Sequence, residues 1–159
     1  IYPQNEIIWS YNWGGRSSSN FARKHEYAWC YSTGKKFLFN GDDVRVDRKV
    51  KNNLRNGKNY TKGTIPTCVW EKNNHTTSKD YCGWHPTTKN LDILERIIRA
   101  YCNENDLVLD PFMGSGSTAI ACKLSNRDYI GCELDKDYIS KARKRIKSYD
   151  RINTLAEIL

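Results

Sequence analysis

The chain has 159 residues, a formal net charge of +8 at pH 7 and six cysteines. This length allows at most one domain, and the excess of lysine and arginine suits a polyanionic partner. No apolar run approaches the length of a membrane span and no signal peptide is visible, so we expect a cytoplasmic protein without a membrane partner. The cysteines show no CxxC or Cys/His ligand spacing, and Cys102, Cys122 and Cys132 lie in apolar segments. We therefore expect reduced, buried thiols and no metal site.

Two strands are predicted near the N-terminus, at residues 6–11 and 27–31, because both segments are rich in aromatic and β-branched residues. The polar residues 14–20 join them as a loop. Residues 37–79 predict irregular structure, since Asn, Lys, Gly and Thr dominate and the apolar islands are short.

Two amphipathic helices are predicted in the C-terminal half. Asn90 caps the first, which runs through residue 101, and Asp135 caps the second, at residues 136–149. The inward residues of the second helix are Tyr138, Ile139, Ala142 and Ile146. Its outer face is expected to hold Lys141, Arg143, Lys144, Arg145 and Lys147. Cations in the last turns of a helix offset its dipole, which favours a solvated surface here over a DNA contact.

The most informative stretch is LVLDPFMGSGST, at residues 107–118. The apolar residues 107–109 are typical of a strand covered on both faces, and Asp110 and Pro111 end it. Gly114 and Gly116 then let the backbone turn sharply and approach a ligand, and an apolar helix follows. A strand, a glycine turn and a helix with an acidic strand end together outline a nucleotide-binding crevice.

A second strand, at residues 129–132, places Glu133 a little over twenty residues after Asp110. An acidic side chain there can accept hydrogen bonds from both hydroxyls of an adenosine ribose. The alternative is a tight turn of an αβ unit with a solvated Glu133. Ala119 replaces the third glycine of the dinucleotide fingerprint, which favours a cofactor without phosphates.

DPFMGSGST followed by IGCELD resembles the S-adenosylmethionine site of the amino-methylating DNA methyltransferases, which methylate adenine N6 or cytosine N4. The family carries DPF-x-GSGTT, so Ser117 replaces a threonine. HPTTK at residues 85–89 resembles the family's HPTQKP, with Thr88 in place of the glutamine and Asn90 in place of the last proline.

The rest of the chain resembles the same family. Residues 5–13 and 23–32 are similar to the paired strands that precede its recognition insert, and the order of elements matches its permuted (beta) arrangement. The resemblance implies an α/β, Rossmann-like methyltransferase fold, incomplete because its central strands are expected upstream. Three segments are implied: a strand pair with a DNA-facing loop, a target-recognition insert and an S-adenosylmethionine-binding αβα segment, at residues 1–36, 37–84 and 85–159.

The resemblance also implies which residues bind S-adenosylmethionine. Glu133 holds the ribose, while Thr87 and Lys89 approach the amino-acid end, where charge pairing of Lys89 with the carboxylate is also favourable. His85 is expected to fix the turn rather than to exchange protons. The residues that wrap the cofactor are Asp110, Pro111, Phe112, Gly114, Ser115, Gly116 and Thr118.

Double-stranded DNA is the expected partner, and the loop between the N-terminal strands is the first candidate surface for it. Arg16, Ser18, Arg23 and Lys24 supply cationic and polar groups that reach phosphates and base edges. The Asn- and Lys-rich residues 48–62 have the same character. For each of these residues a merely solvated loop is the alternative.

The family's catalytic element, (D/N/S)-P-P-(Y/F/W), does not occur in the sequence, whose four prolines are isolated. In the permuted order this element belongs N-terminal to Ile1. We therefore expect the C-terminal part of a longer, site-specific adenine-N6 DNA methyltransferase of the restriction-modification type, inactive as an isolated chain and completed by its N-terminal half or by a second protomer. The alternatives are a cytosine-N4 enzyme, a non-catalytic DNA-binding or partner subunit, and a nucleotide-binding oxidoreductase domain.

Overall fold

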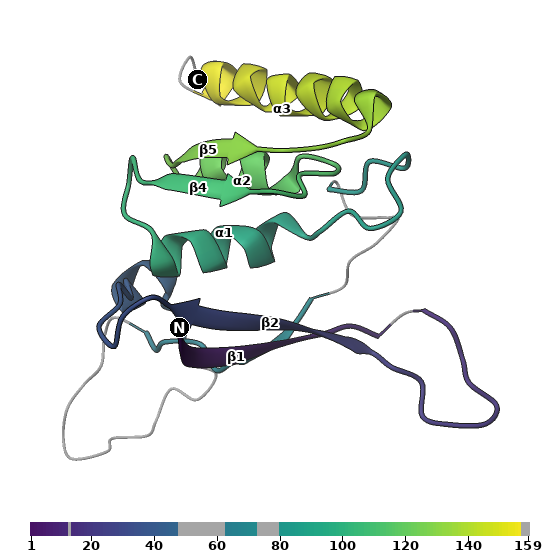
Figure 1. Cartoon of the computed structure of the whole chain (residues 1–159), viewed down its shortest axis with the longest axis vertical. Coiled ribbons are helices and arrows are strands. Elements are labelled where there is room, and N and C mark those ends of the chain that lie inside the picture. Colours follow the sequence, from purple (N-terminus) through teal and green to yellow (C-terminus); the bar gives the residue numbers. More distant parts are fainter. Residues whose placement is uncertain (13, 48–62, 73–79, 157–159) are drawn as a thin grey trace. The chain divides into compact units, whose positions relative to one another are not determined.

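The computed structural model describes residues 1–12, 14–47, 63–72 and 80–156, with side chains as far as residue 150. The chain divides into two compact units, Ile1–Glu71 and Lys72–Leu159, and Figure 1 shows the elements of each. The three segments implied by the resemblance are defined by their functions, which the two compact units do not test, so these segments stay a prediction. Among the described residues, no helix is long and apolar enough to cross a membrane.

The first unit contains a three-stranded sheet in the order β2-β1-β3. β1 (Tyr2–Ser10) pairs antiparallel with β2 (His25–Ser32), and β3 (Val69–Glu71) pairs parallel with β1. The two predicted strands are thus confirmed. β1 begins earlier than expected, because its pairing with β2 continues past a register shift between Pro3 and Asn5.

Between the hairpin and β3 the described residues form only short elements. A 3₁₀ helix, η1, spans Gly41–Val44, and an antiparallel bridge joins Val46 to Thr64. Val44 and Trp70 are buried and anchor this part of the unit. Residues 48–62, which the sequence proposes as a second DNA-contacting segment, lie outside the described part of the chain.

The second unit is built on two parallel strands. β4 (Leu107–Asp110) pairs with β5 (Asp128–Gly131), and α2 (Ser117–Leu124) is the crossover between them. α1 (Leu91–Tyr101) precedes the strands and α3 (Lys136–Ala156) follows them. In Figure 1, α2 lies behind the strands, and it packs against α1, β5 and α3.

Both predicted helix caps are confirmed. Asn90 Oδ1 accepts a hydrogen bond of 3.2 Å from the Ile93 amide at the start of α1. Asp135 Oδ1 accepts hydrogen bonds from the amides of Asp137 and Tyr138, at 2.8 and 3.0 Å. Each side chain satisfies amide groups that the first turn of a helix leaves without an internal partner.

The core of the second unit lies between α1, α2 and one face of the β4–β5 pair. Ile98, Ala121 and Cys122 are buried together, and Val108 and Tyr129 pack against them. The small side chains of α2 let it approach the strands closely, and four consecutive residues of that helix are fully buried: Ala119, Ile120, Ala121 and Cys122.

Within the described residues the first strand, β4, is covered on one face only, as expected of a chain that holds only part of the fold. Successive side chains of a strand point to opposite faces, and only the face that carries Val108 meets α2. Leu107 and Leu109 are 60% and 65% exposed, and Ile130 on β5 is 50% exposed. The described residues therefore leave one apolar face of this sheet without a covering layer.

The cysteine prediction holds in part. All six cysteines are free thiols, and Cys122 is buried, which raises its pKa to about 11. Cys132, in contrast, is exposed. Cys132 directly follows β5, and its exposure differs from the buried position that the apolar pattern predicts.

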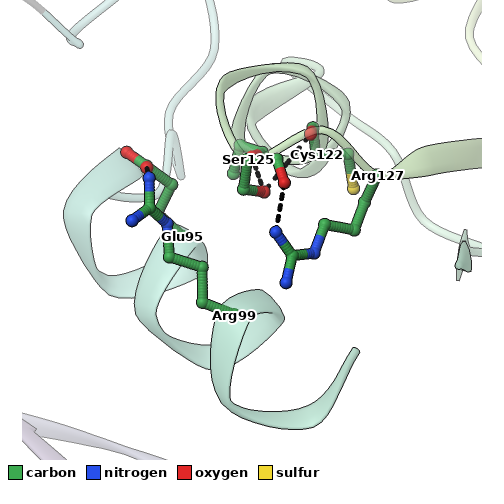
Figure 2. A network of polar contacts seen from close by, with 6 residues as sticks. Glu95, Arg99, Cys122, Ser125 and Arg127 are labelled. Carbon is green, nitrogen blue, oxygen red and sulfur yellow. Dashed lines mark hydrogen bonds and ion pairs between the residues drawn. The ribbon is translucent and has the colours of Figure 1, made fainter. Parts of the chain in front are cut away.

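A buried arginine, Arg127, joins the ends of α1 and α2, and Figure 2 shows its bond to Ser125 at the end of α2. Arg127 donates one hydrogen bond to the carbonyl of Ser125 and another, of 2.7 Å, to the carbonyl of Cys102. These carbonyls lie at helix C-termini, where unsatisfied oxygens carry partial negative charge. Arg127 therefore fixes the spacing of the two helices that support β4 and β5.

Candidate cofactor site

The turn between β4 and α2 is held by its own backbone and by the end of β5. Asp110 Oδ1 accepts a hydrogen bond of 3.0 Å from the Phe112 amide. The Met113 amide donates to the Cys132 carbonyl at 2.8 Å, and the Gly116 amide donates to the Met113 carbonyl at 2.9 Å. The turn is consequently a defined structure at the carboxyl ends of two parallel strands, where ligands bind in open α/β sheets.

Both glycines of the turn are required by the backbone and by their neighbours. Gly114 has φ +51°, and a Cβ atom there would lie 2.8 Å from His85 Nε2. Gly116 has φ +78°, and its Cβ would lie 3.1 Å from Ile146 Cδ1. Positive φ costs little only for glycine, and a side chain at either position would displace His85 or Ile146.

Glu133 binds the turn directly. Its Oε2 accepts a hydrogen bond of 2.8 Å from the Gly114 amide, and its Oε1 accepts bonds of 2.8 and 3.0 Å from the amides of Leu134 and Asp135. The amides of Asp135 and Gly114 hold the pKa of the Glu133 carboxyl below its usual range, so it stays ionised at neutral pH. A carboxylate offers about four acceptor positions, and these three bonds leave one for a ligand hydroxyl, where the sequence predicts acceptance from both ribose hydroxyls.

The hydrogen bonds of the turn also indicate which cofactors suit it. The amides of Phe112, Met113, Gly114 and Gly116 all donate to protein oxygens. A pyrophosphate needs such amides for itself, and it would also face the negative charge of Glu133. These features are unfavourable for a pyrophosphate, and the cofactor without phosphates that Ala119 favours stays a prediction.

Arg145 is the main correction to the predicted site. It was assigned to the outer, solvated face of the last helix, but its guanidinium points inward. Nη1 donates to the Ser115 carbonyl at 2.9 Å and to Ser117 Oγ at 3.0 Å, while Nη2 donates to the Asp80 carbonyl at 2.8 Å. Arg145 follows Ala142 by three residues, so it lies on the buried side of α3. The other cations of the predicted basic face are exposed: Lys141, Arg143, Lys144 and Lys147.

His85 connects the HPTTK segment to the glycine turn. Its Nε2 borders Gly114, and its ring contacts the Tyr138 ring at a centroid distance of 4.8 Å. The Thr87 amide lies 3.3 Å from His85 Nδ1, and Thr88 Oγ1 donates to the His85 carbonyl at 3.1 Å. Burial lowers the pKa of His85, in keeping with a neutral ring that packs against the turn.

The structure thus brings most of the predicted cofactor residues into one place. Phe112 is 87% exposed beside the turn, Pro111 is exposed, and Thr118 is half-buried in the first turn of α2. Thr87 is exposed, and Lys89 Nζ donates to the Thr87 carbonyl at 3.3 Å. Which atoms of a ligand these residues contact stays a prediction.

The predicted DNA-contacting residues belong to the other unit. Arg16, Ser18 and Arg23 are exposed in the loop between β1 and β2. Lys24 differs from them, because its Nζ donates to the carbonyls of Gly14 and Gly15 at 2.9 and 3.2 Å. Lys24 therefore stabilises the loop, and the solvent-exposed positive charges of the loop are those of Arg16 and Arg23.

The sequence matches the DNA methylase family of adenine-N6 and cytosine-N4 enzymes over residues 1–144. The chain belongs to the N6/N4 DNA methylase family. Membership shows that the interpretation as an oxidoreductase domain is wrong, and it agrees with the S-adenosylmethionine-type motifs at the glycine turn.

Curated members of the N6/N4 DNA methylase family resemble the chain over most of its length. Type II methyltransferase M.HpaI from Haemophilus parainfluenzae is 36% identical over 93% of this chain and 46% of its own length. Type II methyltransferase M1.MboII from Moraxella bovis is 38% identical over 87% of this chain and 60% of its own length. DNA adenine methyltransferase YhdJ from Escherichia coli K12 is 33% identical over 90% of this chain and 52% of its own length. The chain thus spans about half the length of the curated relatives it matches.

Solved structures agree with this assignment to the N6/N4 DNA methylases. The M1.HpyAVI–SAM complex is 32% identical with a TM-score of 0.63, over 91% of this chain and 62% of that one. The cytosine-N4-specific PvuII DNA methyltransferase has a TM-score of 0.68 at 18% identity, over 92% of this chain and 56% of that one. At this identity the similarity shows a shared fold and nothing more. The α/β fold is therefore that of DNA methyltransferases, of which this chain holds a part.

Proposed function

We propose that the chain is the cofactor-binding part of a DNA methyltransferase that transfers a methyl group from S-adenosylmethionine to adenine N6. The observation that carries the proposal is the bond between Glu133 and Gly114, which places an ionised acceptor at a glycine turn unsuited to phosphates. Bound S-adenosylmethionine supplies an electrophilic methyl group on its sulfonium. The residues of this chain bind and orient that group.

Each part of the site has a proposed role. Glu133 accepts from the ribose, and Gly114 and Gly116 give the turn the shape that places it at the ends of β4 and β5, beside the cofactor. Lys89 pairs with the carboxylate of the amino-acid end, with Thr87 beside it. The remaining contacts come from the turn itself, through Asp110, Pro111, Phe112, Ser115 and Thr118.

The groups that contact the reacting amine are proposed to lie in the remainder of the full-length protein. This amine is a poor nucleophile, because its lone pair is delocalised into the ring, so a D-P-P-Y-type element must assist it by accepting hydrogen bonds from its N–H groups. The uncovered side chains of Leu107, Leu109 and Ile130 support a missing layer, since a parallel sheet is normally buried on both faces. A second protomer that supplies this layer is the alternative source.

Duplex DNA is the proposed substrate. The target base must leave the helical stack before its amine reaches a methyl donor, and protein contacts offset that cost. The exposed Arg16, Ser18 and Arg23 are the proposed contacts from this chain. Among the relatives, the 33% identity to an enzyme named as a DNA adenine methyltransferase favours adenine N6 over cytosine N4 as the acceptor.

The proposal is tested by expressing the full-length gene in a host that lacks N6-methyladenine and N4-methylcytosine, followed by nucleoside chromatography of its DNA. We expect N6-methyladenine, and sequencing of the modified sites gives the recognised sequence. N4-methylcytosine alone would correct the base but keep the reaction class. Unmodified DNA from a soluble, folded protein would show that the chain belongs to a non-catalytic partner subunit.

A further inference from the structure

The loop between β1 and β2 presents one phenylalanine wholly to solvent. Phe21 is 100% exposed, and its neighbours Asn20 and Ala22 are exposed as well. The loop projects beyond the ends of the two strands in Figure 1, and a hydrogen bond of 3.0 Å from the Tyr11 amide to the Lys24 carbonyl closes its base. A ring in this position offers apolar surface that a bound partner can remove from water.

Side chains of the loop fix the backbone on both sides of Phe21. Ser17 Oγ accepts a hydrogen bond of 3.0 Å from the Asn20 amide, and Asn20 Oδ1 accepts one of 2.7 Å from the Phe21 amide itself. Lys24 Nζ bonds the Gly14 carbonyl across the base of the loop at 2.9 Å. These turns present the ring at a bend whose backbone is already organised.

The charge around Phe21 indicates the kind of partner. Arg16 and Arg23 are exposed on either side of it in the sequence, and residues 12–24 contain no aspartate or glutamate. A loop of one charge sign attracts a polyanion, and guanidinium groups bind phosphate oxygens in a fixed geometry. An aromatic ring adds a surface that stacks on any base, whatever the sequence.

We propose that Phe21 inserts into a base-pair step of duplex DNA as an apolar wedge, while Arg16 and Arg23 bind the flanking phosphates. The inference rests on the proposed function, and it adds the mode of DNA contact. Wedges of this kind partially unstack a step and kink the duplex. A methyltransferase that extrudes a base gains from such unstacking, because the base next to the wedge has already lost part of its stacking.

The test uses the full-length protein and a duplex with 2-aminopurine beside the target base. Phe21→Ala is compared with Phe21→Trp, which keeps a stacking ring, and with Ser19→Ala, an exposed neighbour in the same loop. We expect Phe21→Ala to weaken DNA binding about tenfold and to reduce the rise in 2-aminopurine fluorescence. The slope of log affinity against log salt stays unchanged, since a wedge releases no counterions. Phe21→Trp and Ser19→Ala keep both signals.

Wild-type affinity and fluorescence in Phe21→Ala would overturn the wedge while leaving DNA methylation intact. A lower unfolding temperature of Phe21→Ala would also overturn it, because it would show that the ring packs against the protein. Failure of the wild-type protein to bind or methylate DNA would instead contradict the proposed function. The two failures are therefore distinguishable.

Discussion

Arg145 Nη1 donates a hydrogen bond of 2.9 Å to the backbone carbonyl of Ser115, in the middle of the glycine turn. The same guanidinium reaches the Asp80 carbonyl through Nη2 at 2.8 Å. One side chain on α3 therefore ties together the turn and the segment that leads into HPTTK. We infer that Arg145 is a positioning residue, which keeps the turn in shape without contacting a ligand.

Replacing Arg145 by methionine should loosen the turn. The variant leaves the carbonyls of the buried residues Ser115 and Asp80 without their charged donor, at a cost of about 2 kcal/mol in the free energy of unfolding. We expect S-adenosylmethionine affinity, measured by calorimetry on the full-length protein, to fall roughly tenfold, an estimate from the same loss. Arg143→Met, on the exposed side of α3, serves as the control and should change neither quantity. Equal behaviour of the two variants would refute the positioning role.

Glu133→Ala should weaken S-adenosylmethionine binding by roughly one to two orders of magnitude, as the loss of a charge-assisted contact would. The substitution removes both the proposed ribose acceptor and the bond to the Gly114 amide. Calorimetry on the full-length protein measures the effect, with Glu104→Ala, an exposed glutamate, as the control. Fully retained affinity would remove Glu133 from the cofactor site.

Gly114→Ala should destabilise the turn by about 1–3 kcal/mol, because a non-glycine residue at positive φ is strained. Its Cβ would also lie 2.8 Å from His85 Nε2, so the imidazole must move. Gly15→Ala provides a matched control, since nothing lies within 4 Å of a Cβ at that position. Chemical denaturation of both variants measures the difference, and equal stabilities would mean that the turn tolerates a side chain.

DNA affinity of the full-length protein should fall steeply with salt, with a slope of about 0.9 for each phosphate contact. Replacing Arg16, Arg23 and Lys24 together by alanine should flatten that slope. Most of the effect should come from the two arginines, because Lys24 already bonds the Gly14 carbonyl. Lys144 and Lys147, exposed on α3, form the control pair, and their replacement should hardly change the slope. The reverse result would place the DNA on α3.

Much of the second unit could be predicted because local chemistry determines it. The apolar run before Asp110, the proline after it and the two glycines define the strand, the turn and the start of α2. Asn90 and Asp135 cap helices through bonds to amides two or three residues ahead, which sequence spacing alone can indicate.

Features that depend on distant residues could not be predicted. Arg145 stands within a run of cations, where an outward position is the default, and only its approach to Ser115 shows otherwise. The helical spacing contained a signal. Arg145 lies three residues after the inward Ala142 and four before Tyr149, so all three lie on one side of the helix. The segment that covers the open face of β4 could not be identified for a related reason, because an apolar run predicts a covered strand without showing which segment covers it.

The most direct test of the account measures transfer of a labelled methyl group from S-adenosylmethionine to duplex DNA by the full-length protein, with the products resolved as nucleosides. We predict label in N6-methyladenine, a large loss of transfer in Glu133→Ala at limiting cofactor, and no transfer by the isolated 159-residue chain. Label at cytosine C5, or undiminished transfer by the Glu133 variant, would contradict the proposed site and reaction. Transfer by the isolated chain would show that the groups acting on the amine lie within it.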